Sequence, residues 1–139
     1  MGAKTKAFDI NGGMLPCRLS HHKVLLIYTA GMPSPAWRAM YGRLLESLPP
    51  TTPINHWGDV DEGGFRIAST IATVARAAGF SLRPYGMSPD DVPVKMRVKA
   101  SAWTLERIHH FACAAGWFEL GQAMREAAFV SEQESLERA

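Results

Sequence analysis

Two aspartates one residue apart, Asp59 and Asp61, have the types and spacing best suited to chemistry in this 139-residue chain. They follow a short apolar run at 54–57, which is predicted to be a strand. Along a strand, residues i and i+2 lie on the same side, so both carboxylates are expected to point together. Paired carboxylates repel unless a cation lies between them, and magnesium is commonly held by one or two carboxylates plus phosphate oxygens. The pair therefore predicts a site for Mg²⁺, or Mn²⁺ in its place, that binds a ligand carrying phosphate.

The residues after the aspartates fit a ligand that carries phosphate. Gly63 and Gly64 leave room for a ligand near the backbone, and the N-terminus of the helix that follows favours anions. Arg66 is a candidate phosphate ligand, although a solvated or ion-paired arginine explains it equally well. The simpler alternative for the aspartates is a turn in which one of them caps this helix.

The elements that must position this site read as strand, helix, strand, helix, strand. Strands are predicted at 24–29, 54–57 and 80–85, and helices at 35–48 and 65–78, from apolar runs and from helical spacing. Short joins between alternating elements indicate a parallel α/β sheet, in which ligands bind beyond the carboxyl ends of the strands. Gly31 and Ser34 lie at such an end and are further candidates for binding phosphate or DNA.

The remaining segments complete one predicted domain at 24–139, behind an irregular segment at 1–23. Residues 86–99 are expected to form a loop, and helices at 101–115 and 119–128 make a helical end at 100–139, following the α/β part at 24–99. The aromatic residues of that end are predicted to lie in the core rather than to form a base-stacking platform: Trp103, Trp117 and Phe118.

Composition predicts a folded, soluble, cytoplasmic protein. A net charge of +2 is too small to indicate nucleic-acid binding on its own. Two cysteines are too few for a disulfide framework and suit a reducing compartment. The chain shows no apolar stretch long enough to cross a membrane and no apolar run typical of a signal peptide.

Three stretches carry a resemblance to a known family: YTAGMPS at 28–34, HWGDVDEGGFRIA at 56–68 and EQE at 132–134. Together they resemble the C-terminal domain of Wadjet JetD-type proteins, over roughly residues 24–136. That domain is a TOPRIM fold, a Rossmann-like parallel sheet flanked by helices, related to those of topoisomerases and of the topoisomerase VI A-subunit and Spo11 group.

The resemblance implies divalent-metal-dependent cleavage of plasmid DNA, in which a JetD-type subunit acts after a condensin-like complex has detected the plasmid. Asp59 and Asp61 match the TOPRIM aspartate pair, and Glu132 and Glu134 match the terminal Glu-Gln-Glu, which adds an acid to the site. The implied partners are DNA and the condensin-like Wadjet subunits, with a homodimer as a further option. From the residues alone, Ser131-x-x-Glu134 is better explained as a capping box that opens a short terminal helix, and the family match makes the two explanations equal.

The chain departs from the TOPRIM pattern upstream. TOPRIM domains carry a glutamate at the end of their first strand, whereas the acids before Asp59 are Asp9 and Glu46. We therefore expect an N-terminally truncated form, and a non-catalytic remnant or fragment that binds DNA or partner subunits is the alternative function. A phosphatase-like enzyme with Asp59 as nucleophile is a third reading, but it expects threonine or valine where Gly63 stands.

Overall fold

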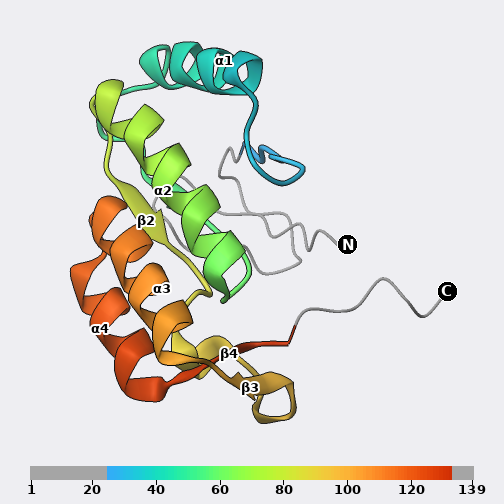
Figure 1. Cartoon of the computed structure of the whole chain (residues 1–139). Coiled ribbons are helices and arrows are strands. Elements are labelled where there is room, and N and C mark those ends of the chain that lie inside the picture. The colour runs from blue at the N-terminus through green and yellow to red at the C-terminus, as the bar shows by residue number, and fades with distance from the viewer. Residues whose placement is uncertain (1–24, 133–139) are drawn as a thin grey trace, which may run out of the picture.

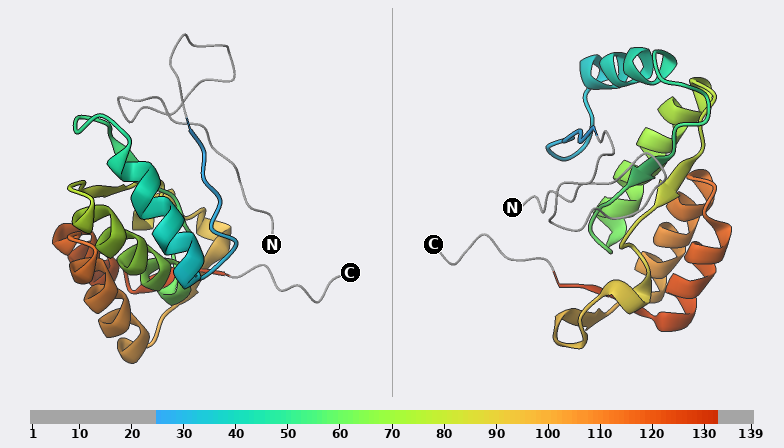
Figure 2. Two further views of the ribbon diagram at one scale, coloured as in Figure 1. Left: turned by 90° about the horizontal axis from the view of Figure 1, so that it is seen from above. Right: turned by 180° about the vertical axis from the view of Figure 1, so that it is seen from behind.

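The computed structural model describes residues 25–132. Its helices and strands run in the order α1 (Pro35–Glu46), β1 (Ile54–His56), α2 (Glu62–Ala77), β2 (Leu82–Pro84), the single-turn 3₁₀ helices η1 (Pro89–Asp91) and η2 (Val94–Met96), β3 (Arg97–Lys99), α3 (Ala102–Ala114), α4 (Phe118–Ala127) and β4 (Phe129–Ser131). Figures 1 and 2 show that the four helices follow one another across the molecule, with α1 at one end and α4 at the other.

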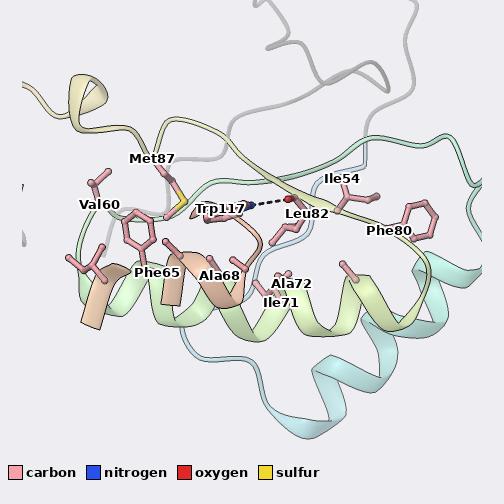
Figure 3. Packing of buried hydrophobic residues seen from close by; sticks show 14 of the residues in the cluster. Ile54, Val60, Phe65, Ala68, Ile71, Ala72, Phe80, Leu82, Met87 and Trp117 are labelled. Carbon is pink, nitrogen blue, oxygen red and sulfur yellow. Dashed lines mark hydrogen bonds between the residues drawn. The ribbon is translucent and has the colours of Figure 1, made fainter. Parts of the chain in front are cut away.

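The centre of the fold is a β1–α2–β2 unit. β1 and β2 pair in parallel, with Ile54 opposite Leu82 and His56 opposite Pro84. The helix between them buries one broad stripe at helical spacing, made of Gly64, Phe65, Ala68, Ile71, Ala72 and Ala75. Figure 3 shows this stripe facing the side chains of the strands, with Trp117 lying between them. Burying a side chain such as that of Phe65, which is 0% exposed, stabilises the fold by about 1.5–3 kcal/mol.

The helical end packs against this unit through α3, which contacts α2 on one side and α4 on the other. Trp117, between α3 and α4, donates from Nε1 to the Leu82 carbonyl at 2.9 Å and so ties the helical end to β2. Gly121 lets α4 approach α3 closely, because a Cβ there would lie 3.0 Å from His109 Cδ2. The two helices predicted at 101–115 and 119–128 are confirmed, with bounds that differ by one residue at each end.

The predicted strand at 24–29 is wrong for the residues that the structure describes. Residues 25–30 form neither helix nor strand, and Leu25 and Tyr28 are 61% and 62% exposed. The described part of the parallel sheet has only two strands, so this apolar run has no neighbour to supply ladder hydrogen bonds. Positive φ angles at Ala30 and Gly31 then turn the chain into α1. The described fold is therefore mixed α/β with one parallel pair, smaller than the sheet expected.

A second small sheet was predicted as loop. β3 pairs antiparallel with β4, with Val98 opposite Val130. Residues 86–99 thus hold two 3₁₀ turns and a strand rather than irregular chain. Ser131, the expected start of a capping box, is the last residue of β4, and Glu134 lies outside the described residues.

Candidate functional site

The aspartate loop runs from the end of β1 to the start of α2 and is packed tightly against that helix. A Cβ on Gly64 would lie 1.9 Å from the carbonyl oxygen of Asp59, so only glycine fits at this position. The space expected for a ligand beside Gly64 is instead filled by the backbone of Asp59. Gly63 is exposed, and a Cβ there would lie 3.4 Å from Asp61 Oδ1. Gly64 therefore fixes the shape of the loop rather than opening it.

The two aspartates differ in their surroundings. Asp61 is 8% exposed, has extended backbone and is the N-cap of α2, where its Oδ1 accepts a hydrogen bond of 2.7 Å from the Gly64 N–H. Asp59 is exposed. The capping interpretation is thus confirmed for Asp61, and such a cap is worth about 1 kcal/mol. Metal binding by the pair stays a prediction.

A hollow of about 370 Å³ opens at this cap, and carboxylates from two distant segments line it. Asp61 and Glu62 come from the start of α2, and Glu132 comes from the residue after β4. The apolar and hydroxyl side chains of the lining are Val98, Thr104, Val130 and Ser131.

Two backbone hydrogen bonds bring Glu132 to this place. The Ser131 N–H donates to the Val60 carbonyl at 2.9 Å, which joins β4 directly to the aspartate loop. The Glu132 N–H donates to the Met96 carbonyl at 2.7 Å. A residue 71 positions after Asp61 in the sequence therefore lines the same hollow.

A cation already faces one of these acids. Arg107 of α3 forms an ion pair with Glu62 through its Nε, and both side chains are more than a third exposed. The guanidinium of Arg107 also lies between two rings, 5.8 Å from the centroid of Trp103 and 5.4 Å from that of Phe111. The ion pair links the start of α2 to α3, and because both groups are solvated it contributes little to stability.

The donor set fits Mg²⁺ or Mn²⁺ in its chemistry, since carboxylate oxygens are the hard ligands these ions prefer. Within residues 25–132, however, no group of three or more His, Cys, Asp or Glu side chains is placed to hold an ion. A metal bound here would need part of its coordination from water or from a substrate phosphate, which is the usual arrangement for magnesium.

The other candidates for binding phosphate lie outside the lining of the hollow. Arg66 is exposed on α2, one turn after Glu62 and on the same face of the helix. Ser34 caps α1, where its Oγ accepts from the Trp37 N–H at 3.1 Å, and Gly31 has a φ of +102° in the preceding turn. Gly31 and Ser34 thus have structural roles at the start of α1, and phosphate binding by them stays a prediction.

His56, at the end of β1, is packed inside the fold, as an inward strand histidine would be. Burial lowers the pKa of His56 from 6.5 to about 4, so the ring is neutral near pH 7. Its Nε2 is buried and has no hydrogen-bond partner among the described residues. The ring of Trp117 lies 6.4 Å from that of His56, centroid to centroid.

Sequence reasoning misplaced two aromatic residues of the helical end. Trp117 is 6% exposed, which confirms its predicted place in the core, but Trp103 is 72% exposed and Phe118 is 59% exposed. The spacing contained a signal for Trp103: Trp103, Arg107 and Phe111 repeat every four residues on α3, on a different face from the buried Leu105, Ile108 and Ala112. The ion pair between Glu62 and Arg107 was not predicted from the sequence.

Comparison with known families gives a match over most of the chain. Residues 11–108 match the family model described as Wadjet protein JetD, C-terminal. Asp59, Asp61 and Arg107 fall inside the matched span and Glu132 falls outside it. No curated protein and no solved structure matches the chain. None of the helices formed by residues 25–132 is long and apolar enough to span a bilayer.

Proposed function

Because the chain belongs to the family of C-terminal regions of Wadjet protein JetD, which implies a role in Wadjet anti-plasmid defence, we propose that it carries a divalent-metal-dependent site for cutting DNA strands. In this proposal the parallel β1–α2–β2 unit is the remaining centre of a TOPRIM-type fold. The other Wadjet subunits and DNA are its partners, and a homodimer is a further arrangement consistent with the proposal.

The observation that carries the proposal is the meeting of Asp61, Glu62 and Glu132 on one hollow, whose lining begins two residues after Asp59 in the sequence. Asp59 and Asp61 would hold the ion, and Glu132 would supply the further acid that the family pattern expects elsewhere. Bound there, Mg²⁺ would polarise a phosphoryl oxygen and lower the pKa of a water nucleophile. Glu134, which the same pattern implicates, lies outside the described residues.

The chain's own side chains would orient the metal ligands and bind the substrate phosphate. The cap bond from Gly64 holds the Asp61 carboxylate in one orientation, so no ordering is needed when substrate binds. Arg66, exposed one turn further along α2, offers a guanidinium suited to a phosphate oxygen pair. The Val98 and Val130 side chains line the hollow and keep part of its wall apolar.

The test is nicking of a supercoiled plasmid by the full chain with Mg²⁺ or Mn²⁺. The variants Asp59→Asn and Asp61→Asn should abolish metal-dependent nicking, and Asp61→Asn should do so without loss of fold because asparagine also caps helices. Asp90→Asn, a change at an exposed acid on η1, is the matched control and should cut like the wild type. Nicking that survives in both loop variants would refute the proposal.

One observation favours a second function, a DNA- or partner-binding domain that does not cut. The described residues form no ready cluster of three or more metal ligands, and Asp61 has a sufficient structural role as a cap. This alternative predicts that the wild type binds DNA or Wadjet subunits but shows no nicking with either metal. Titration calorimetry with Mn²⁺ alone, on the wild type and on the two loop variants, distinguishes a chain that binds no metal from a chain that binds metal but does not cut the DNA supplied.

A further inference from the structure

An exposed tryptophan stands next to the hollow. Trp103, the second residue of α3, is 72% exposed, whereas Trp37 and Trp57 are half-buried and Trp117 is 6% exposed. The next residue, Thr104, lines the hollow. A side chain of this size usually loses most of its surface to the core or to a partner. Its exposure at this position therefore needs an explanation that packing within the described residues does not give.

Arg107 connects Trp103 to the acids of the hollow. Its guanidinium lies 5.8 Å from the centre of the Trp103 ring, while its Nε is paired with Glu62. The ring thus has a cation on one side, held in position by a carboxylate and by a second ring, that of Phe111. Aromatic rings supported by arginine are surfaces on which nucleobases stack.

One exposed cation lies close to the acids of the hollow. Arg66 is exposed on α2, one turn after Glu62, which lines the hollow. Lys95, Arg97 and Lys99 are also exposed, with no acid among residues 92–99. Because Val98 lines the hollow and successive side chains of a strand point to opposite faces, Arg97 and Lys99 lie on the other face of the small sheet. Arg66 is therefore the cation suited to contact a polyanionic strand that carries one phosphate towards the metal ligands.

We propose that Trp103, supported by Arg107, is a stacking platform for a base of an unpaired DNA strand, and that Arg66 contacts a phosphate of that strand. The inference deepens the proposed function, on which it rests for the choice of DNA as ligand. The base is unpaired because a flat, protruding ring can stack only on a base face that is not covered by its neighbours. A continuous duplex presents base edges in its grooves, and not base faces.

The experiment measures binding of a fluorescein-labelled single-stranded oligonucleotide, and of its duplex, to the full chain in EDTA. Truncating a stacked aromatic side chain weakens binding about 5- to 150-fold, so Trp103→Ala should raise the Kd for the single strand by a factor in that range. Trp103→Phe keeps a ring and should restore most of the affinity. Phe118→Ala removes another exposed ring, at the start of α4, and should bind like the wild type.

A second readout reports on Trp103 directly. Acrylamide quenching of tryptophan fluorescence should fall when the oligonucleotide binds, and this protection should vanish in Trp103→Phe because the other tryptophans are less exposed. Arg66→Ala should reduce the dependence of log Kd on log salt by about one phosphate contact.

These measurements separate the platform from the cleavage proposal, because binding in EDTA requires neither metal nor cutting. Loss of single-strand binding in Trp103→Ala, in a chain that never nicks plasmid, supports the platform and rejects cleavage. Cutting that depends on Asp59, together with unchanged binding and quenching in Trp103→Ala, rejects the platform alone. The inference would also be overturned if Trp103→Ala weakened binding to the single strand and to the duplex equally, or if the wild type did not bind the single strand. It would be overturned as well if Trp103→Ala lost binding to a Wadjet subunit and kept binding to DNA.

Discussion

Helices α1 and α2 begin with the same arrangement in different surroundings. Ser34 caps α1 through a bond to the Trp37 N–H, and Asp61 caps α2 through a bond to the Gly64 N–H. Each cap follows an apolar run and a glycine-containing turn. The run before α1 is exposed and unpaired with any described strand, whereas the run before α2 is β1, paired in register with β2.

The difference teaches what a helix N-terminus needs in order to become a candidate site. At α1 the cap is neutral and exposed, and the helix buries only Tyr41 and Leu45. At α2 the cap is a buried carboxylate, and the end of β4 is bonded to the same loop and adds Glu132. Convergence of distant segments, rather than the helix terminus itself, marks the α2 end.

The largest difference between the two helix starts is expected when one methyl group is added at Gly64, near the start of α2, and at Gly31, in the turn before α1. Gly64→Ala places a Cβ 1.9 Å from the Asp59 carbonyl oxygen, so the loop must move, and we expect a loss of about 3 kcal/mol or more of unfolding free energy. Gly31→Ala meets no atom within 4 Å and is opposed only by its φ of +102°, at about 1–2 kcal/mol. Urea denaturation measures both, and equal losses would contradict the tight packing of the aspartate loop.

The residues of β1 are buried or half-buried, whereas the run at 25–30 is mostly exposed. The pH dependence of the unfolding free energy tests this burial through His56 of β1. The pKa of His56 is about 4 in the folded state and 6.5 when exposed, so the unfolded chain binds the proton first. Stability is full above pH 6.5 and falls as the pH drops towards 4, by up to about 3 kcal/mol. His56→Phe should flatten the curve of unfolding free energy against pH in this window.

The matched control for that experiment is His110→Gln, at an exposed histidine of α3. Because this substitution leaves the buried ring of His56 in place, the variant should keep the steep wild-type fall between pH 6.5 and 4. A wild-type curve that is flat in that window would show that His56 is hydrated or hydrogen-bonded in solution.

The elements that sequence analysis predicted are those specified by local pattern. Helices α1 to α4 show apolar stripes, α1 to α3 also begin with a capping side chain, and the run that ends in β1 is marked by the prolines before it. Pairing between distant segments was not predictable in this way. The run at 25–30 has the composition of a strand but no described partner, and β3 and β4 are three-residue strands that pair across about 30 residues.

In the candidate site, too, the residues specified by a local pattern were predictable and those brought in by distant pairing were not. Asp59 and Asp61 follow from a local pattern, and so does the cap at Asp61, which was the simpler of the two explanations. Glu132 was suggested by family resemblance alone, because its approach depends on the bond from Ser131 to Val60. Trp103 was placed in the core because large aromatic residues usually lie there, and its exposure depends on which face of α3 meets α2.

The smallest expected effect separates the structural role of Asp61 from its chemical one. Asp61→Ala removes the cap and should cost about 1–2 kcal/mol, while Asp61→Asn keeps a capping oxygen and should cost a few tenths. Ser34→Ala at the other helix should cost about 1 kcal/mol or less, because that cap is exposed. If α2 carries the metal site, both Asp61 variants lose Mn²⁺ binding by calorimetry, although only one is destabilised, and Ser34→Ala keeps it. Retention of Mn²⁺ binding in Asp61→Asn would reduce Asp61 to a helix cap and leave the two helix starts chemically alike.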